Sequence, residues 1–326
     1  MSKISDELED VKTHCESQIQ GSKIVTCVPS MVRVDIRRTK YKQLTACMQF
    51  PELYPHYPLL LELKSKTLED KFLSGLTKVC ETECKKILGK PQVLKTLNFL
   101  KAFIDENPLS VCSEELSSIK RRLEECDQIK LKQKLSSIIL HISKNLYFLR
   151  VKIIVPEHYP EEQVQINIVE CNFPPSFQKW FFGQSMEIAR RCIEKPLKPK
   201  PKDPPFVPKP SLWQTVKFLI DEVKRFPSEF CQLCKEFCFP ADPKANVVDE
   251  TNGKHIERVY CGHLFHNACL DSYMKTPPFH GGKKCPSCKQ RIYHEKWKIA
   301  PKLAEDRWAH QEAKKRELGE VVEFFE

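Results

Sequence analysis

Long apolar runs are absent from this chain of 326 residues. A helix that crosses a membrane needs about 18 or more consecutive apolar residues, and no run in the sequence approaches that length. The opening segment, MSKISDELED, is charged and lacks the apolar stretch that is typical of a secretory signal. We therefore expect no membrane span, no secretory signal and no membrane partner.

Paired cysteines are also scarce outside the last third of the chain. The sequence has 16 cysteines, and ten of them show no paired metal-binding arrangement. These ten are Cys15, Cys27, Cys47, Cys80, Cys84, Cys112, Cys126, Cys171, Cys192 and Cys238. Free thiols of this kind predict a reducing compartment, the cytoplasm or the nucleus. Cys80 and Cys84 could hold a metal from one helix face, but they have no partner pair, and two buried helix cysteines are the simpler interpretation.

The last third of the chain contains eight metal-ligand side chains in four close pairs. The ligands are Cys231, Cys234, Cys261, His263, His266, Cys269, Cys285 and Cys288. Zinc takes four nitrogen or sulfur ligands in a tetrahedron, so eight ligands predict two closed sites that hold two Zn²⁺ ions. A closed site has no open position for water and builds a fold rather than performing chemistry at the metal. The function should therefore lie in the surface that the metals hold in place.

The order of these ligands resembles the RING finger, in its form with three cysteines, two histidines and three cysteines. The resemblance covers residues 229–292, with gaps of 26 and 15 residues between the ligand groups. It implies two interleaved sites, which would cross-brace a segment too short for a large hydrophobic core. Zinc 1 would be held by Cys231, Cys234, His266 and Cys269, and zinc 2 by Cys261, His263, Cys285 and Cys288.

Two alternatives concern this ligand assignment. A PHD finger would place a cysteine pair third and would usually have a tryptophan two residues before the last pair, where this chain has Lys283. Cys238 lies four residues after Cys234 and could replace a ligand, although the pair of Cys231 and Cys234 fits better. The RING resemblance is therefore the main interpretation.

RING modules generally act as ubiquitin ligases, so the resemblance implies docking of a ubiquitin-charged conjugating enzyme without a covalent intermediate on the ligase. Three positions match the docking groove of the family: Leu233, Tyr273, where the family often has tryptophan, and Pro286. Lys289 follows the last ligand and matches a basic residue that bridges ubiquitin and the conjugating enzyme. Arginine is commoner there, because its planar fork reaches two acceptors. The alternative for Lys289 is an exposed loop lysine.

A duplicated unit fills the rest of the chain. FPELYPHYPLLLEL (50–63) and VPEHYPEEQVQINI (155–168) share an apolar-Pro-Glu-x-Tyr-Pro turn followed by a strand-like run. In each copy an amphipathic segment and two strand-like segments precede the turn, and helix-period segments at 95–108 and 214–227 follow it. The second copy is longer because of a Lys/Pro-rich insert at 195–210, which cannot be helix or inner strand.

This organisation resembles the RWD domain, a relative of the ubiquitin-conjugating fold, at residues 1–110 and 111–228. The resemblance implies an α+β chain with two tandem RWD sandwiches, then the two-zinc RING module, then a charged helical tail at 293–326. The order of domains resembles that of RWD–RING ubiquitin ligases. These include the Fanconi anaemia ligase subunit, with a double RWD region, and ligases with a single RWD domain.

Neither copy has the pattern of an active conjugating enzyme. That chemistry needs a nucleophilic cysteine beside an asparagine presented in a His-Pro-Asn segment. Asn172 follows Cys171, but the His-Pro-Asn element is missing. We therefore expect both copies to be binding modules, and we expect Tyr54 and Tyr159 to pack within their Tyr-Pro turns.

Positive charge gathers near the C-terminus of a chain whose formal net charge is +10. These residues could bind nucleic acid or an acidic protein face, and a solvated basic helix explains them at least as well. The segment between Cys234 and Cys261 is polar and predicts a surface loop, with a hairpin at Asn252 and Gly253.

These patterns predict a ubiquitin ligase whose partners are a conjugating enzyme, ubiquitin and a protein substrate, with the RWD region binding substrate or scaffold. The second hypothesis is a non-catalytic zinc-binding adaptor in a larger complex. A third hypothesis is an RNA- or ribosome-associated factor that uses the basic tail.

Overall fold

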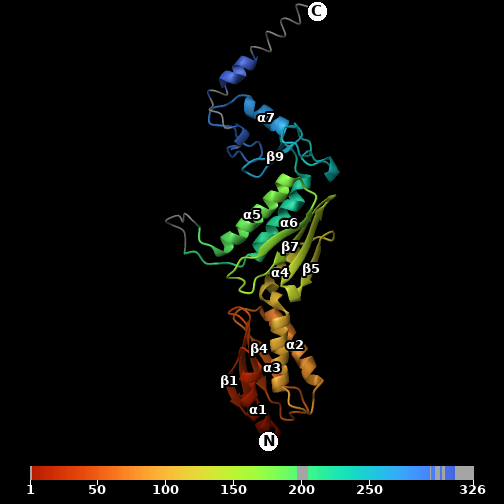
Figure 1. Cartoon of the computed structure of the whole chain (residues 1–326), viewed down its shortest axis with the longest axis vertical. Coiled ribbons are helices and arrows are strands. Elements are labelled where there is room, and N and C mark those ends of the chain that lie inside the picture. Colours follow the sequence, from red (N-terminus) through yellow and green to blue (C-terminus); the bar gives the residue numbers. More distant parts are fainter. Residues whose placement is uncertain (1, 197–204, 294, 298–301, 303–304, 313–326) are drawn as a thin grey trace, which may run out of the picture. The chain divides into compact units, whose positions relative to one another are not determined.

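The computed structural model describes residues 2–196, 205–293, 295–297, 302 and 305–312 (Figure 1). Helices and strands are mixed along the chain, which confirms the predicted α+β class. None of the described helices is both long and apolar enough to cross a membrane.

The N-terminal domain is a four-stranded sheet with helices before and after it. Its elements are α1 (Ser2–Gln18), β1 (Ser22–Val28), β2 (Met31–Arg37), β3 (Gln43–Gln49), β4 (Leu60–Lys64), α2 (Asp70–Lys85) and α3 (Val93–Glu106). The strands lie in the order β1-β2-β3-β4, and each pairs antiparallel with its neighbour. The two strands predicted before the Tyr-Pro turn are β2 and β3, and the helix predicted at 95–108, at the end of the domain, is α3.

Alternation along β2 decides which face of this sheet is covered. Val32, Val34 and Ile36 are fully buried, whereas Arg33 and Arg37 are exposed. Successive side chains of a strand point to opposite faces, so the apolar set faces one way. That face packs against the helices.

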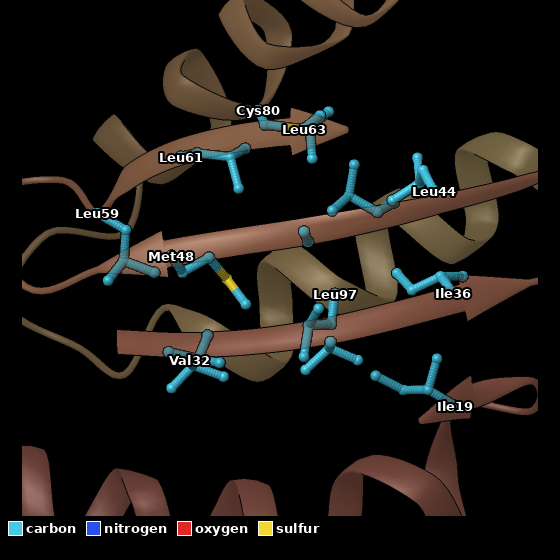
Figure 2. Packing of buried hydrophobic residues seen from close by; sticks show 14 of the residues in the cluster. Ile19, Val32, Ile36, Leu44, Met48, Leu59, Leu61, Leu63, Cys80 and Leu97 are labelled. Atoms are coloured by element: carbon cyan, nitrogen blue, oxygen red, sulfur yellow. The ribbon is translucent and has the colours of Figure 1, made fainter. Parts of the chain in front are cut away.

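Figure 2 shows part of the core that results. Ile36 from β2 and Met48 from β3 belong to one buried cluster with Leu97 from α3. Burying a side chain of the size of Leu97 stabilises the fold by roughly 1.5–3 kcal/mol. Cys80 and Cys84 are both buried on α2, as the sequence predicted.

Residues 108–228, called the second domain from here on, repeat this plan. Their elements are η1 (Pro108–Cys112), α4 (Ser113–Arg122), β5 (Gln128–Lys132), η2 (Gln133–Leu135), β6 (Ser137–Lys144), β7 (Tyr147–Ile154), β8 (Gln165–Cys171), α5 (Pro175–Ile193), α6 (Leu212–Arg225) and η3 (Phe226–Ser228). The strand order, β5-β6-β7-β8, corresponds to that of the first sheet. In β6, Ile138, Leu140 and Ile142 are buried at alternate positions. The Tyr54–Pro55 and Tyr159–Pro160 bonds are both cis.

The tyrosine of the first Tyr-Pro turn is buried against a glutamate that the sequence did not single out. The Tyr54 hydroxyl donates a hydrogen bond to Glu7 of α1. Glu7 Oε1 also accepts the backbone N–H groups of Gln92 and Val93, at 2.8 and 2.7 Å. These groups begin α3, whose N-cap residue supplies no side-chain cap. The carboxylate from α1 therefore caps α3 and complements its dipole.

The second domain contains the same arrangement. The Tyr159 hydroxyl donates to Glu115 of α4 at 2.5 Å, and Glu115 Oε1 accepts the backbone N–H of Trp213 at 2.8 Å. The N–H of Leu212, at the start of α6, donates to the Tyr159 hydroxyl at 3.0 Å. Burial raises the pKa of Glu115 and of Tyr159. Tyr159 therefore reaches beyond its turn and helps to fix the start of the last helix.

The chain divides into two compact units. The first consists of Met1–His141, Arg150–Glu170 and Trp180–Ile220, and the second of Ile142–Leu149, Cys171–Lys179 and Asp221–Glu326. The cysteine-rich segment thus shares a unit with short segments of the second domain. The domain boundaries after residues 110, 228 and 292 stay predictions.

Within the first unit, basic side chains near the β2–β3 turn pair with the segment that carries the second Tyr-Pro turn. Arg38 Nε donates to Glu157 at 2.8 Å, and the buried Lys42 lies 3.2 Å from the same carboxylate. Lys40 pairs with Glu161 at 2.8 Å. Burial lowers the pKa of Lys42, so Glu157 offsets part of the cost of burying that charge.

Two predicted segments lie partly outside the described residues. Residues 197–204 of the Lys/Pro-rich insert are outside them, and residues 205–210 contain neither helix nor strand, as predicted. Of the charged tail, residues 305–312 are helical, and residues 313–326 lie outside the described part.

Candidate metal centres

The two Cys-x2-Cys pairs are built on turns of the same shape, here called the first knuckle (residues 230–237) and the second knuckle (residues 284–291). In each, the first cysteine exchanges backbone hydrogen bonds with residues four and five positions later. The bonds run from Lys235 N–H to Cys231 O (2.8 Å), Cys231 N–H to Glu236 O (2.8 Å), Lys289 N–H to Cys285 O (2.9 Å) and Cys285 N–H to Gln290 O (2.7 Å). Lys235 and Lys289 have φ values of 67° and 63°, in the left-handed region that non-glycine residues seldom adopt. The closed turns keep the two thiols of each pair close together.

The other four ligands lie on a hairpin and on the helix that follows it. The elements are β9 (Ile256–Arg258), β10 (Leu264–His266) and α7 (Asn267–Lys275). β9 and β10 pair antiparallel, and their connection carries Cys261 and His263. His266 ends β10, and Cys269 lies in the first turn of α7. One short hairpin-and-helix unit therefore presents ligands for both of the expected zinc sites.

The hairpin that the sequence predicted at Asn252 and Gly253 is wrong. The chain reverses between β9 and β10 instead, where Gly262 has a φ of +90°. Neither Asn252 nor Gly253 has the positive φ that an Asn-Gly hairpin turn requires. The Asn252 side chain instead accepts the backbone N–H of Lys254 at 2.9 Å, which is the local Asx bond that competes with strand pairing.

In the described part of the chain, the eight ligands gather into two groups. One is Cys231, Cys234, His266 and Cys269, and the other is Cys261, His263, Cys285 and Cys288. The ligand atoms of each group all lie within 4.8 Å of one another. These are the two interleaved sets that the RING resemblance implied.

The separations of the ligand atoms fit a tetrahedral zinc ion. Cys234 Sγ lies 3.3 Å from His266 Nδ1, and Cys261 Sγ lies 3.4 Å from His263 Nδ1. With Zn–S of about 2.3 Å and Zn–N of about 2.0–2.1 Å, a tetrahedron requires sulfur–nitrogen separations of about 3.5 Å. Three thiols and one imidazole also form a donor set that zinc prefers. Each group is therefore compatible with one Zn²⁺ ion.

Local hydrogen bonds favour the ionised form of one ligand. Burial opposes ionisation of Cys231, but hydrogen bonds from His266 and from the backbone N–H groups of Cys234 and Leu233 lower the pKa of its thiol to about 6. Hydrogen bonding to Cys231 raises the pKa of His266 to about 9. Because the thiolate is the form that binds metal, the fold prepares Cys231 for coordination, with a proton on His266 to be released on binding.

Two charged residues that the sequence analysis missed hold the hairpin in place. Glu229 Oε1 accepts the backbone N–H of Leu264 at 2.9 Å, and Arg225 Nη2 donates to the carbonyl of Gly262 at 3.2 Å. Arg225 also forms an ion pair with Glu229. Burial raises the pKa of Glu229. The sequence pattern could not predict the role of Arg225 and Glu229, because the residues that they bind lie more than thirty positions away.

An aromatic cluster connects three parts of the second unit with the segment that follows the first knuckle. Its members are Tyr147, Phe173, Phe177, Phe226 and Phe239. The ring of Phe239 lies 5.2 Å from that of Tyr147 and 5.0 Å from that of Phe177. The Tyr147 hydroxyl donates to the carbonyl of Pro240 at 2.9 Å. The cysteine-rich segment therefore shares a hydrophobic core with the starts of β7 and α5 and with η3, which follows α6.

Two further cysteines do not join the ligand groups. Cys238 is buried beside the first knuckle, and burial raises its pKa. Burial also raises the pKa of Cys171 to about 11, which makes its thiol a weak nucleophile. Asn172 uses its side chain to bind the Phe148 N–H at 2.8 Å and the Leu146 carbonyl at 2.7 Å. Asn172 therefore closes the β6–β7 turn against the end of β8.

The residues predicted to dock a conjugating enzyme come from both knuckles and α7. Leu233 and Pro286 are half-buried in the first and second knuckles. Tyr273 is half-buried on α7, and its hydroxyl donates to the carbonyl of Lys284 at 2.8 Å. Lys289 is exposed, and its Nζ donates to the carbonyl of Pro286 at 3.0 Å. Tyr273 thus ties α7 to the second knuckle, and the docking role of these residues stays a prediction.

Comparison with known families identifies the class of the N-terminal domain. The model of the family described as the RWD domain matches residues 2–104. That α+β domain is therefore an RWD domain, which confirms the prediction for the first copy. A search of curated proteins found no match to the chain. The second RWD domain and the RING finger stay predictions.

Proposed function

We propose that this protein is a RING-type ubiquitin ligase. Residues 229–292 dock a ubiquitin-charged conjugating enzyme, and the RWD region binds the substrate or a scaffold. A substrate lysine amine attacks the thioester carbonyl, ubiquitin is transferred to that amine, and the thiol of the conjugating enzyme leaves. The ligase contributes positioning and electrostatics and carries no covalent intermediate.

The observation that carries this proposal is the interleaving of the two ligand groups. The first knuckle shares its group with the end of β10 and α7, and the second knuckle shares its group with the β9–β10 connection. Such cross-bracing is what the RING resemblance implied, and it fixes α7 beside the second knuckle. Tyr273 and Pro286 then belong to one rigid surface, which suits docking of another folded protein.

Residues 111–228 are proposed to be a second RWD domain, which makes the binding region tandem. Its sheet has the same strand order as the first. The pair of Glu115 and Tyr159 holds the start of α6 just as the pair of Glu7 and Tyr54 holds the start of α3. A buried polar network of this kind has strict geometric demands, so its recurrence supports a common fold.

A discharge assay tests the ligase function directly. The full chain, purified with zinc, is mixed with a panel of ubiquitin-charged conjugating enzymes and free lysine, and loss of the thioester is followed. Faster discharge with at least one enzyme is the expected result. No acceleration with any member of the panel, in folded protein with two zinc equivalents, would remove the ligase function.

Lys289→Ala is expected to slow this discharge by at least tenfold, because the side chain that would bridge ubiquitin and the conjugating enzyme is lost. Lys235→Ala is the matched control: it removes a lysine with nearly the same φ from the equivalent position of the first knuckle. It should leave the rate within about twofold, because this exposed side chain makes only a surface hydrogen bond, from its Nζ to Gln232 at 3.0 Å. Equal losses in both variants would assign the effect to the turns rather than to the Lys289 ammonium.

A zinc-stabilised adaptor is the second candidate, favoured by the replacements at two docking positions. Tyr273 offers less apolar area than the tryptophan common in the family, and Lys289 lacks the planar fork of arginine. An adaptor would keep its partners in Leu233→Ala and Lys289→Ala proteins and would not accelerate discharge. A ligase should lose activity with either change.

A further inference from the structure

Lys283 is a buried lysine in the loop before the second knuckle. Its relative exposure is only 6%. The ammonium lies 4.5 Å from the centroid of the Tyr273 ring and 5.7 Å from that of the Phe279 ring. Its Nζ is not among the side-chain nitrogen and oxygen atoms of the described residues that are sealed from solvent without a hydrogen-bond partner. The stem is therefore buried between aromatic groups while the charged end stays within reach of a partner.

No carboxylate in the described part of the chain pairs with this ammonium. The sequence from residue 276 to residue 294 contains no Asp or Glu at all. The same stretch carries three more cations, Lys284, Lys289 and Arg291, and Arg291 is stacked at 5.3 Å on the ring of Tyr293. The second knuckle and the loop before it therefore form a basic face beside Tyr273.

A cation removed from water without an anion is an unfavourable arrangement in a folded protein. Attraction to two aromatic rings recovers only part of the lost hydration. A carboxylate arriving with a partner would complete the arrangement. Charge-assisted hydrogen bonds are the stronger kind, and less remains to be desolvated at a site that is already buried.

We propose that Lys283 is a specificity-determining residue of the docking face: its ammonium binds a carboxylate of the incoming conjugating enzyme. The chain therefore selects conjugating enzymes that present an acidic side chain next to the surface that meets Tyr273. This inference rests on the proposed ligase function. Leu233, Tyr273 and Pro286 supply apolar contact, whereas Lys283 discriminates between partners by charge.

A protein carboxylate fits this site better than a nucleic-acid phosphate. Nucleic-acid backbones are bound by arrays of exposed lysines and arginines that follow the strand. Lys283 offers a single ammonium sunk between two rings, which a slender side chain can approach and a continuous phosphate backbone meets poorly. Its position next to Tyr273 also places it on the face that the conjugating enzyme would cover.

The test measures lysine discharge as a function of the concentration of a charged conjugating enzyme that the full-length, zinc-loaded wild type activates. Lys283→Met deletes the charge and keeps an apolar stem of similar length. It should raise the half-saturating concentration about tenfold, the effect of one charge-assisted hydrogen bond, with the saturating rate within about twofold. The neighbouring Lys284→Met is the matched control and should shift it by less than about threefold, as expected for an exposed charge.

A reciprocal arm first changes the conjugating enzyme while this chain stays wild type, so that step does not depend on how Lys283→Met folds. Each Asp or Glu on the docking face of the same conjugating enzyme is changed to lysine in turn. One of these changes should reproduce the tenfold shift, and Lys283→Glu should recover at least part of the lost affinity for that enzyme variant.

Three outcomes would overturn the proposal. A wild type that accelerates discharge while Lys283→Met keeps the same half-saturating concentration, with no acidic position of the enzyme mattering, leaves the ligase function intact and removes the role of Lys283. A wild type that activates no enzyme removes both. A short labelled RNA that binds the wild type, displaces the charged enzyme and loses its binding in Lys283→Met assigns the ammonium to nucleic acid.

Discussion

Cys285→Ser should release one of two bound zinc equivalents and unfold residues 229–292. Cys285 is fully buried and belongs to the group formed with Cys261, His263 and Cys288. A structural zinc site contributes roughly 10–16 kcal/mol of apparent folding free energy in isolated fingers. That contribution is comparable in size to the roughly 5–15 kcal/mol by which whole domains are stable. Metal content by mass spectrometry and limited proteolysis of the segment are the measurements.

Cys238→Ser is the control for this experiment. Cys238 is a buried cysteine within the same segment but belongs to neither ligand group. The variant should keep two zinc equivalents and the protease resistance of the segment, with a modest loss of stability from the buried hydroxyl. Loss of zinc in Cys238→Ser, or two equivalents retained in Cys285→Ser, would show that the ligands are assigned wrongly.

Glu115→Ala should lower the free energy of unfolding of the second domain by about 3–5 kcal/mol. The carboxylate accepts the Tyr159 hydroxyl and the Trp213 N–H at the start of α6. Its removal leaves these donors buried without acceptors, at roughly 1–3 kcal/mol each, together with a cavity. Urea unfolding followed by tryptophan fluorescence is the measurement, in a Trp297→Phe, Trp308→Phe background. The two remaining tryptophans, Trp180 and Trp213, lie in this domain, and residues 1–110 contain none.

Glu115→Gln is the conservative comparison. The pH dependence of the free energy of unfolding predicts that it destabilises the domain less than Glu115→Ala. Burial raises the pKa of Glu115 above its usual 4.5, so the folded state holds the carboxyl proton more tightly than the unfolded chain. The stability from this group is complete below about 4.5 and is lost as the pH rises through the raised value. Glutamine stays neutral and avoids that loss, so Glu115→Gln should cost less than about 1.5 kcal/mol at neutral pH. An alanine variant as stable as the glutamine variant would contradict the capping role.

Glu7→Ala offers a test of the duplication with the same experiment. Its carboxylate accepts hydrogen bonds from the Tyr54 hydroxyl and from the backbone N–H groups of Gln92 and Val93 in the RWD domain. Glu7→Ala should lower the free energy of unfolding measured by far-ultraviolet circular dichroism as much as Glu115→Ala does. It should shift the urea midpoint measured by tryptophan fluorescence less than Glu115→Ala does.

The parts of the fold that could be predicted from the sequence are those with local, periodic signals. The Tyr-Pro turn is a short pattern that occurs twice, and alternation in β2 and β6 gives the buried face directly. The capping role of Glu7 and Glu115 could not be predicted. Each is one acidic residue in an amphipathic helix, and its partners lie up to 98 residues away.

The eight ligands of the candidate site could be predicted because metal coordination sets strict spacing within each pair, and their division into two interleaved groups was implied by the resemblance to the RING finger. What surrounds them could not. The turn at Asn252 and Gly253 satisfied its hydrogen bonds locally, and the hairpin formed at Gly262 instead. Arg225 and Glu229, which hold that hairpin, are ordinary surface-type residues in the sequence, and only the three-dimensional packing gives them buried partners.

The aromatic cluster determines where the protein can be divided. A fragment that starts at residue 229 would strip the ring of Phe239 of its neighbours Tyr147, Phe173 and Phe177. It would also leave the Pro240 carbonyl without the Tyr147 hydroxyl. Such a fragment would expose a hydrophobic patch and would tend to aggregate even with both metals bound. A fragment made to study the cysteine-rich segment should therefore also contain residues 111–228, which cover this patch.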